Sequence, residues 1–240
     1  MPAERGNSGA VGVLVPPSAS GYNRLEDLPQ DLELRMCRTL ALLVLLAFAP
    51  VAVGGKFNKA LGVGDAAPAW ADLEGTDGAK HALADLKGKA VVVVAFTCNS
   101  CPVARDYEDR LIALGKTYAA ADSAVAVVAV NVNTGKDDAL PAMTARAAKR
   151  KFPFAYLYDP SQEIARKYGA AYTPEVFVLD KDRKVVYLGA FDDQAPPGEP
   201  AARHVEEAVR AALAGKPAAT GETSASSGCR IKFAAKKRDE

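Results

Sequence analysis

The feature that most constrains the fold is a pair of cysteines placed directly between a strand and a helix. Residues 90–96 read AVVVVAF, a β-branched run typical of a strand that is buried on both faces. Cys98 and Cys101 follow at once, and Pro102 suits the first turn of a helix because proline has no N–H to donate. The apolar residues after Pro102 recur at steps of three and four, which predicts that helix.

This arrangement predicts redox chemistry at the two cysteines. A cysteine at a helix N-terminus lies near unpaired N–H groups and the positive end of the helix dipole, which favour the thiolate. We therefore expect Cys98 to be the thiolate, with Cys101 about one turn on and close enough to form a disulfide. In such motifs the first cysteine attacks a partner's disulfide and the second resolves the mixed disulfide. The chemistry requires neither a metal nor a cofactor.

A C-x-x-C pair also occurs in zinc sites and in structural disulfides. A zinc site needs two further ligands, and the candidates are His81, His204 and the distant Cys229. His81 lies in a lead-in segment and His204 on a predicted closing helix, and both are typical of ordinary surface histidines. The redox reading is therefore favoured, with structural zinc and a structural disulfide as alternatives.

The rest of the chain predicts alternating strands and helices. The expected elements are a strand at 125–132, helices at 138–151 and 162–168, a hairpin of strands at 176–179 and 184–188, and a closing helix at 200–213. This order predicts an α/β domain over 62–215, with a central sheet and helices on both faces. The tail, 216–240, begins with a Gly, Ser and Thr-rich stretch that predicts a flexible linker.

A second candidate site lies at Thr173, Pro174 and Glu175. Pro174 immediately precedes a predicted strand, where a proline is tolerated. The combination of strand, C-x-x-C, helix and a distant Thr-Pro before a strand resembles the thioredoxin superfamily, and more closely its redoxin branch, which includes peroxiredoxins of the AhpC/TSA type. The residues that carry this resemblance are Gly64–Pro68, Leu86–Lys89, Phe96–Pro102, Phe152–Phe154, Tyr156–Asp159, Asp192–Asp193 and Gly228–Phe233.

The resemblance implies a thioredoxin-like fold with a central mixed sheet, and a thiol-disulfide oxidoreductase that acts on protein or small-thiol partners. It also implies that Pro174 is cis and lies beside the disulfide. The backbone of Thr173 would then be free to pair with an extended substrate segment.

The sequence also departs from these families. Thr97 stands where thioredoxins usually have a tryptophan, and residues 90–96 lack the buried carboxylate that relays protons, so Glu175 is the nearest substitute. Peroxiredoxins place a threonine three residues before the peroxidatic cysteine, whereas this chain has Ala95 there. An antioxidant peroxidase is therefore the first alternative function. The non-enzymatic alternative is a copper-binding or chaperone-type protein of the same fold.

Charge and N-terminal composition bear on partners and location. The chain has 30 basic and 29 acidic residues, which does not resemble the basic footprint of a nucleic-acid binder. Residues 36–55 resemble a secretory signal, because residues 40–49 read LALLVLLAFA after two arginines and small residues follow. A periplasmic or secreted location is expected, with a membrane anchor through residues 40–53 or a buried helix as alternatives. Residues 1–35 fit a signal badly and are interpreted as disordered or as a misassigned start before Met36.

Removal of a signal would leave Cys229 as an odd thiol, which in an oxidising compartment is buried, paired or used. Its candidate role is a third redox thiol that returns to the active site. Ile231 and Phe233 are the expected apolar anchors of a docked tail. The alternative is an incidental thiol on a flexible segment.

Overall fold

The computed structural model of the chain describes residues 54–235. The predicted upstream segment and nearly all of the predicted signal therefore lie outside the described residues. Within residues 54–235, no helix has the length and apolar character needed to cross a membrane.

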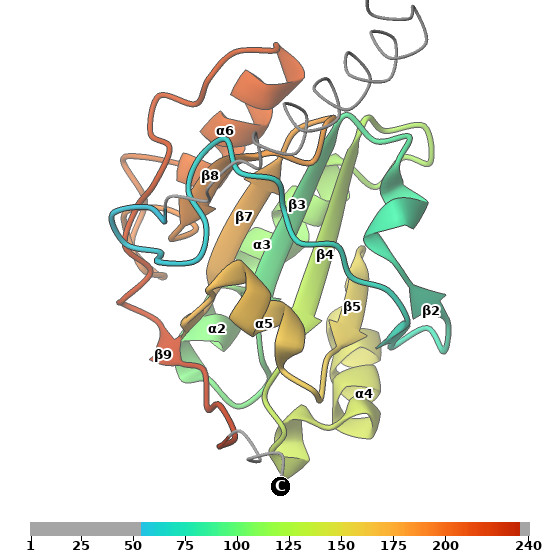
Figure 1. Cartoon of the computed structure of the whole chain (residues 1–240). Coiled ribbons are helices and arrows are strands. Elements are labelled where there is room, and N and C mark those ends of the chain that lie inside the picture. Colours follow the sequence, from blue (N-terminus) through green and yellow to red (C-terminus); the bar gives the residue numbers. More distant parts are fainter. Residues whose placement is uncertain (1–53, 236–240) are drawn as a thin grey trace, which may run out of the picture. The chain divides into compact units, whose positions relative to one another are not determined.

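A seven-stranded mixed sheet forms the centre of the domain (Figure 1). In sheet order its strands are β2 (Lys80–His81), β1 (Leu73–Gly75), β5 (Ala155–Tyr158), β4 (Val125–Asn131), β3 (Val91–Thr97), β7 (Glu175–Leu179) and β8 (Val185–Gly189). The three strands β3, β4 and β5 run parallel, and β1, β2, β7 and β8 are joined by antiparallel pairings. The predicted central mixed sheet is confirmed.

Helices cover both faces of this sheet, as the alternating pattern predicted. One face packs against α3 (Glu108–Thr117), α4 (Leu140–Arg150) and α6 (His204–Leu213). The other packs against α5 (Glu163–Tyr168) and the lead-in segment, as Figure 1 shows in front of β3 and β7. Because strand side chains alternate between faces, Val91, Val93 and Ala95 enter the first layer and Val92, Val94 and Phe96 enter the second.

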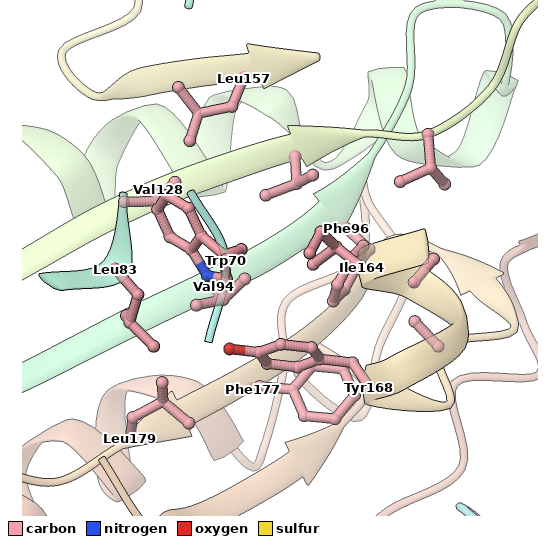
Figure 2. Packing of buried hydrophobic residues seen from close by; sticks show 14 of the residues in the cluster. Trp70, Leu83, Val94, Phe96, Val128, Leu157, Ile164, Tyr168, Phe177 and Leu179 are labelled. Carbon is pink, nitrogen blue, oxygen red and sulfur yellow. The ribbon is translucent and has the colours of Figure 1, made fainter. Parts of the chain in front are cut away.

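An aromatic cluster fixes α5 against the sheet (Figure 2). The ring of Tyr168 meets the rings of Phe96 and Phe177 edge to face, at centroid distances of 5.5 and 5.2 Å. All three side chains are fully buried, and each such ring contributes on the order of 1.5–3 kcal/mol by burial alone. The segment between α5 and β7, which includes Thr173 and Pro174, therefore starts and ends on anchored elements.

Three local features differ from the sequence-based expectation. The sheet has additional strands, since β5 lengthens its parallel part and β1 and β2 extend it beyond β5. The helix after the cysteines is divided at Tyr107 into α2 (Pro102–Asp106) and α3. The third is a separate two-stranded sheet of β6 (Tyr172–Thr173) and β9 (Cys229–Arg230), which brings the tail back to the domain.

The tail was predicted to be flexible from its composition, but within residues 54–235 it is bonded to the domain at several points. Thr223 N–H donates to the carbonyl of Leu188 at 3.0 Å, and Leu188 N–H donates to the carbonyl of Gly221 at 3.0 Å. The Glu222 carboxylate accepts backbone N–H bonds from residues 56–58 in the lead-in segment. Polar composition indicates only a lack of apolar anchors, whereas here backbone groups and one carboxylate supply the contacts.

Candidate active site

The two cysteines lie at the carboxyl end of β3, in a loop that leads into α2. Cys98 follows the last residue of β3, and Cys101 is the N-cap of α2, where its Sγ accepts the N–H of Ala104 at 3.3 Å. Pro102 takes the first turn of α2, as expected, but the expectation that Cys98 lies at the helix N-terminus is wrong, because Cys101 holds that position. Both thiols are reduced and buried, with Cys98 at 2% and Cys101 at 3% exposure.

A buried carboxylate holds the loop between the cysteines. Asp138 lies in a 3₁₀ turn at Lys136–Asp138, and its Oδ1 accepts the N–H of Asn99 at 2.7 Å and of Ser100 at 3.1 Å. The Asn99 side chain is bonded as well, since its Oδ1 accepts the hydroxyl of Tyr156 at 3.0 Å. The backbone donors nearest to Cys98 are therefore already occupied by a negatively charged group.

The surroundings of the two sulfurs shift the pKa values of the reduced pair in opposite directions. The hydrogen bond that Cys98 donates to Cys101, together with burial, raises the pKa of Cys98, and the Asp138 carboxylate adds to this. The same hydrogen bond lowers the pKa of Cys101; bonds from the thiol of Cys229, the hydroxyl of Thr173 and the N–H of Ala104 act in the same direction, against the effect of burial. The sequence led us to expect the lowered pKa at Cys98, whereas in the structure the contacts raise the pKa of Cys98 and lower that of Cys101.

Thr173 and Pro174 lie against the cysteine pair. The Thr173–Pro174 peptide bond is cis, as the resemblance implied. Thr173 Oγ1 lies 3.5 Å from Cys98 Sγ, and the carbonyl oxygen of Thr173 lies 3.3 Å from Cys101 Sγ. One residue therefore contacts both sulfurs, one through its side chain and the other through its backbone.

We expected the backbone of Thr173 to be free to pair with an extended substrate segment, but it is already paired. In the structure the chain's own tail occupies this edge: β9 pairs antiparallel with β6, and Cys229 stands opposite Thr173. Gly228 permits this approach, because a Cβ at that position would lie 2.6 Å from the carbonyl oxygen of Thr173. Figure 1 shows β9 beside α2, the helix that begins after Cys101.

Several side chains hold the tail in this place. Ile231 is buried in the main core, as expected of an anchor, and its N–H donates to the carbonyl of Ala171 at 2.9 Å. Phe233 remains 37% exposed and instead packs under the Arg166 guanidinium, 4.5 Å from its ring centroid. The buried Gln162 donates to the carbonyl of Lys232 at 2.9 Å and accepts the N–H of Ala234 at 2.7 Å.

Glu175, the candidate proton relay, is buried but has other bonds. Its Oε2 accepts the N–H of Ala171 at 2.8 Å and of Tyr172 at 3.0 Å, which fixes the turn before β6. Burial raises the pKa of Glu175, and these two bonds oppose the shift. No hydrogen bond joins Glu175 to either cysteine among the contacts of residues 54–235. Its role as a relay remains a prediction, whereas its role in fixing the loop is visible.

Sequence reasoning missed Asp138, although the chain held a signal for it. Because β3 and β4 run parallel with Thr97 opposite Asn131, the segments after both strands start at the same sheet edge. Polar residues soon after β4 are therefore placed near the cysteine loop, and Asp138 is one of them. Of the candidate zinc ligands, Cys229 lies against the pair, whereas His81 is bonded to Asp77 and His204 begins α6. Within residues 54–235, no group of three or more His, Cys, Asp or Glu side chains is arranged to hold a metal ion.

Comparison with known proteins identifies the family. The sequence model of the redoxin family matches residues 62–205, more than half of the chain. The chain belongs to the redoxin family. This redoxin has a thioredoxin-like fold, and membership of the family assigns it a thioredoxin-like redox function.

Two solved structures resemble this redoxin over most of its length. A hypothetical protein of Sinorhizobium meliloti is 31% identical, with 75% of this chain and 98% of that chain covered and a TM-score of 0.66. An uncharacterised protein of Geobacillus kaustophilus is 34% identical, with 73% and 94% covered and a TM-score of 0.65. A thiol:disulfide interchange protein of Chlorobium tepidum is a more distant match, 22% identical with a TM-score of 0.47 over 62% and 95%. No functionally curated protein matches the sequence significantly.

Proposed function

We propose that this redoxin is an exported thiol-disulfide oxidoreductase whose redox couple is the Cys98–Cys101 pair. The observation that carries this proposal is the contact of both buried thiols with Thr173, next to the cis Thr173–Pro174 bond. The two cysteines also lie in one buried cluster, in which each shifts the pKa of the other. A disulfide here would join the loop after β3, which holds Cys98, to the N-cap of α2, which is Cys101.

The overall reaction transfers two electrons. In the reducing direction, Cys98 and Cys101 become a disulfide while the partner's disulfide becomes two thiols. The two protons released by the pair pass to the partner. In the oxidising direction the same steps run backwards, and a dithiol partner is converted to a disulfide. The proposed partners are proteins or small molecules that carry thiols or disulfides, and no cofactor is required.

Turnover with a dithiol donor and a disulfide substrate tests this proposal. Replacing Cys101 by serine removes the couple, and we expect the catalysed rate to fall close to that of the uncatalysed exchange. Cys37→Ser is the matched control, because it removes a thiol that is not part of the proposed couple. A Cys101→Ser variant that kept the wild-type rate would show that the couple is assigned wrongly.

Two observations weigh against the peroxidase alternative. The residue three positions before Cys98 is Ala95, which lies within β3 and has no hydroxyl to position a peroxide. The raised pKa of Cys98, caused chiefly by the hydrogen bond to Cys101 and by burial, also disfavours the thiolate that attacks peroxide. The disulfide-exchange function therefore remains the better supported one.

Export is proposed from the sequence alone. It is supported by the apolar run at residues 40–49 and by the small residues that follow it. N-terminal sequencing of the native protein tests this: a mature chain that starts near residue 55 is expected, and an intact residue 36–55 segment in a membrane fraction would instead favour the anchor.

A further inference from the structure

Three thiols of the described chain form one row that leads from the core to the surface. Cys98 is the innermost, and Cys101 is buried beside it. Cys229 packs against this pair from the tail and is half-buried, so it is the thiol of the three with most contact with solvent. The Cys229 thiol interacts with Cys101, because their contact lowers the pKa of Cys101 and raises that of Cys229. Cys101 therefore has two thiol neighbours, Cys98 and Cys229.

The position of Cys229 is built into the fold. The strand pairing of β9 with β6 sets Cys229 opposite Thr173, the residue that contacts both sulfurs of the pair. Gly228 allows the close approach, and the buried Ile231 fixes the segment on the other side. Because these contacts use the backbone or neighbouring side chains, none of them depends on the Cys229 thiol. The fold thus places the Cys229 thiol next to Cys101, although the stability of the docked tail does not depend on that thiol.

The tail also controls access to the pair. Cys98 and Cys101 are almost fully covered, and the edge of Thr173 on which an extended substrate would pair is taken by β9. A partner that approaches the docked tail therefore meets Cys229 first.

We propose that Cys229 is the thiol through which the redox pair exchanges disulfides with external thiols, and that Cys101 alternates between a disulfide with Cys98 and a disulfide with Cys229. This inference rests on the proposed function of the Cys98–Cys101 couple and adds the point at which the partner is met. In this scheme Cys229 on the tail is the first thiol to exchange with the Cys98–Cys101 disulfide, before any external thiol.

The exchange is balanced at each step. Starting from the oxidised pair, the Cys229 thiol loses its proton and attacks Cys101 Sγ. A Cys101–Cys229 disulfide forms, the Cys98–Cys101 bond breaks, and the Cys98 thiolate that leaves takes up the proton that Cys229 lost. An external thiolate then attacks Cys229 Sγ, which forms a mixed disulfide and releases Cys101 as a thiolate. A second external thiol attacks the mixed disulfide, releases Cys229, and leaves as a disulfide. The protein gains two electrons, which the two external thiols supply.

The second step suits the environment of Cys101. A disulfide breaks faster when the sulfur that leaves is stable as a thiolate. Cys101 is stabilised in that form by the N–H of Ala104 at 3.3 Å, and its pKa is lowered, whereas the pKa of Cys229 is raised. Attack on a Cys101–Cys229 disulfide at Cys229 therefore expels the better leaving group of its two sulfurs.

The experiment uses the full chain with Cys37→Ser as the common background, and glutathione as the external thiol. In the first arm, reduction of the oxidised protein by glutathione is followed by stopped flow for the background and for an added Cys229→Ser. We expect the added change to slow reduction about tenfold or more, because glutathione must then attack a buried disulfide directly. Circular dichroism of the Cys229→Ser protein should be unchanged, since β9 pairs through its backbone.

In the second arm, Cys98→Ser is added to the background and the protein is oxidised with glutathione disulfide. A Cys101–Cys229 disulfide is then expected in most molecules by mass spectrometry of the digested protein. Adding Gly228→Ala should lower the yield of this cross-link, because the new Cβ pushes β9 away from Thr173 while all thiols remain.

Both arms are required to give the expected result. Reduction of Cys229→Ser within twofold of the background rate, or faster, would overturn the inference, and so would separate glutathione adducts on Cys101 and Cys229 in place of the cross-link. These outcomes are distinct from failure of the proposed function, in which the background protein itself forms no Cys98–Cys101 disulfide and shows no turnover.

Discussion

Replacing Asp138 tests the reasoning on which the geometry of the cysteine loop depends. Its carboxylate accepts backbone N–H bonds from Asn99 at 2.7 Å and Ser100 at 3.1 Å, and an Asn131 amide N–H lies 3.4 Å away. Asp138→Ala leaves these donors without an acceptor at a site where Asp138 is 2% exposed. We expect the substitution to lower the free energy of unfolding and to displace the loop that holds the cysteine pair.

The size of the effect follows from the two short bonds. A hydrogen bond to a charged group contributes about 1.5–3 kcal/mol, so the pair gives roughly 3–6 kcal/mol before any relaxation. Ser100 is only partly buried and water can replace one bond, which reduces the expected loss to about 2–4 kcal/mol. For a domain of this size, each kcal/mol lowers Tm by about 2–4 °C, so a decrease of roughly 5–15 °C is expected.

Asp138→Asn separates charge from hydrogen bonding, because the amide oxygen can still accept both N–H bonds. The Asp138 charge adds to the raised pKa of Cys98, so removing it should lower that pKa. Cys98 should then react with iodoacetamide at lower pH than in the wild-type protein.

The assay combines thermal unfolding by circular dichroism with alkylation rates from pH 5 to 10. Asp137→Ala is the matched control, because it removes the same charge from an exposed neighbour that contributes only its backbone carbonyl to Asn99. If Asp138→Ala changed Tm by no more than Asp137→Ala does, the carboxylate would not hold the loop. An unchanged alkylation profile in Asp138→Asn would refute the electrostatic part.

Three further predictions concern the loop, the tail and the chemistry. Because burial raises the pKa of Glu175, its carboxyl contributes most to stability below about pH 4.5 and loses that contribution as pH rises through the folded-state pKa. Glu175→Gln should therefore flatten the dependence of the unfolding free energy on pH above 4.5, and urea titrations that gave the wild-type slope would contradict this. Gln162→Ala removes the bonds to Lys232 and Ala234, so we expect a loss of about 2 kcal/mol and faster alkylation of Cys229. Unchanged alkylation, with Glu163→Ala as the control, would show that the tail is held elsewhere. Finally, the protein should reduce hydrogen peroxide far more slowly than it exchanges disulfides, since Ala95 supplies no hydroxyl beside Cys98; a stopped-flow rate similar to that of dedicated peroxidases would promote the peroxidase function instead.

The local pattern of the chain was sufficient to predict the central layers of the fold. Short-range patterns in the sequence predicted three features: strand β3 (Val91–Thr97), the hairpin of β7 and β8, and helices on both faces of the sheet. The position of the two cysteines after a strand and before a helix follows from the same local signals. Four-residue β5 was missed because it is short and follows α4 after only a few residues, where periodicity carries little information.

The electrostatics of the site depended on contacts between distant segments. No local rule places Asp138 on the N–H groups of Asn99 and Ser100, nearly forty positions earlier, where its charge adds to the raised pKa of Cys98. The docking of Cys229 opposite Thr173 likewise joins residues more than fifty positions apart. The sequence by itself determined which groups can do chemistry and which segments form strands and helices, because those properties depend on neighbouring residues. Which thiol is charged and which edge is covered depend on distances in space, and only the packed chain sets these.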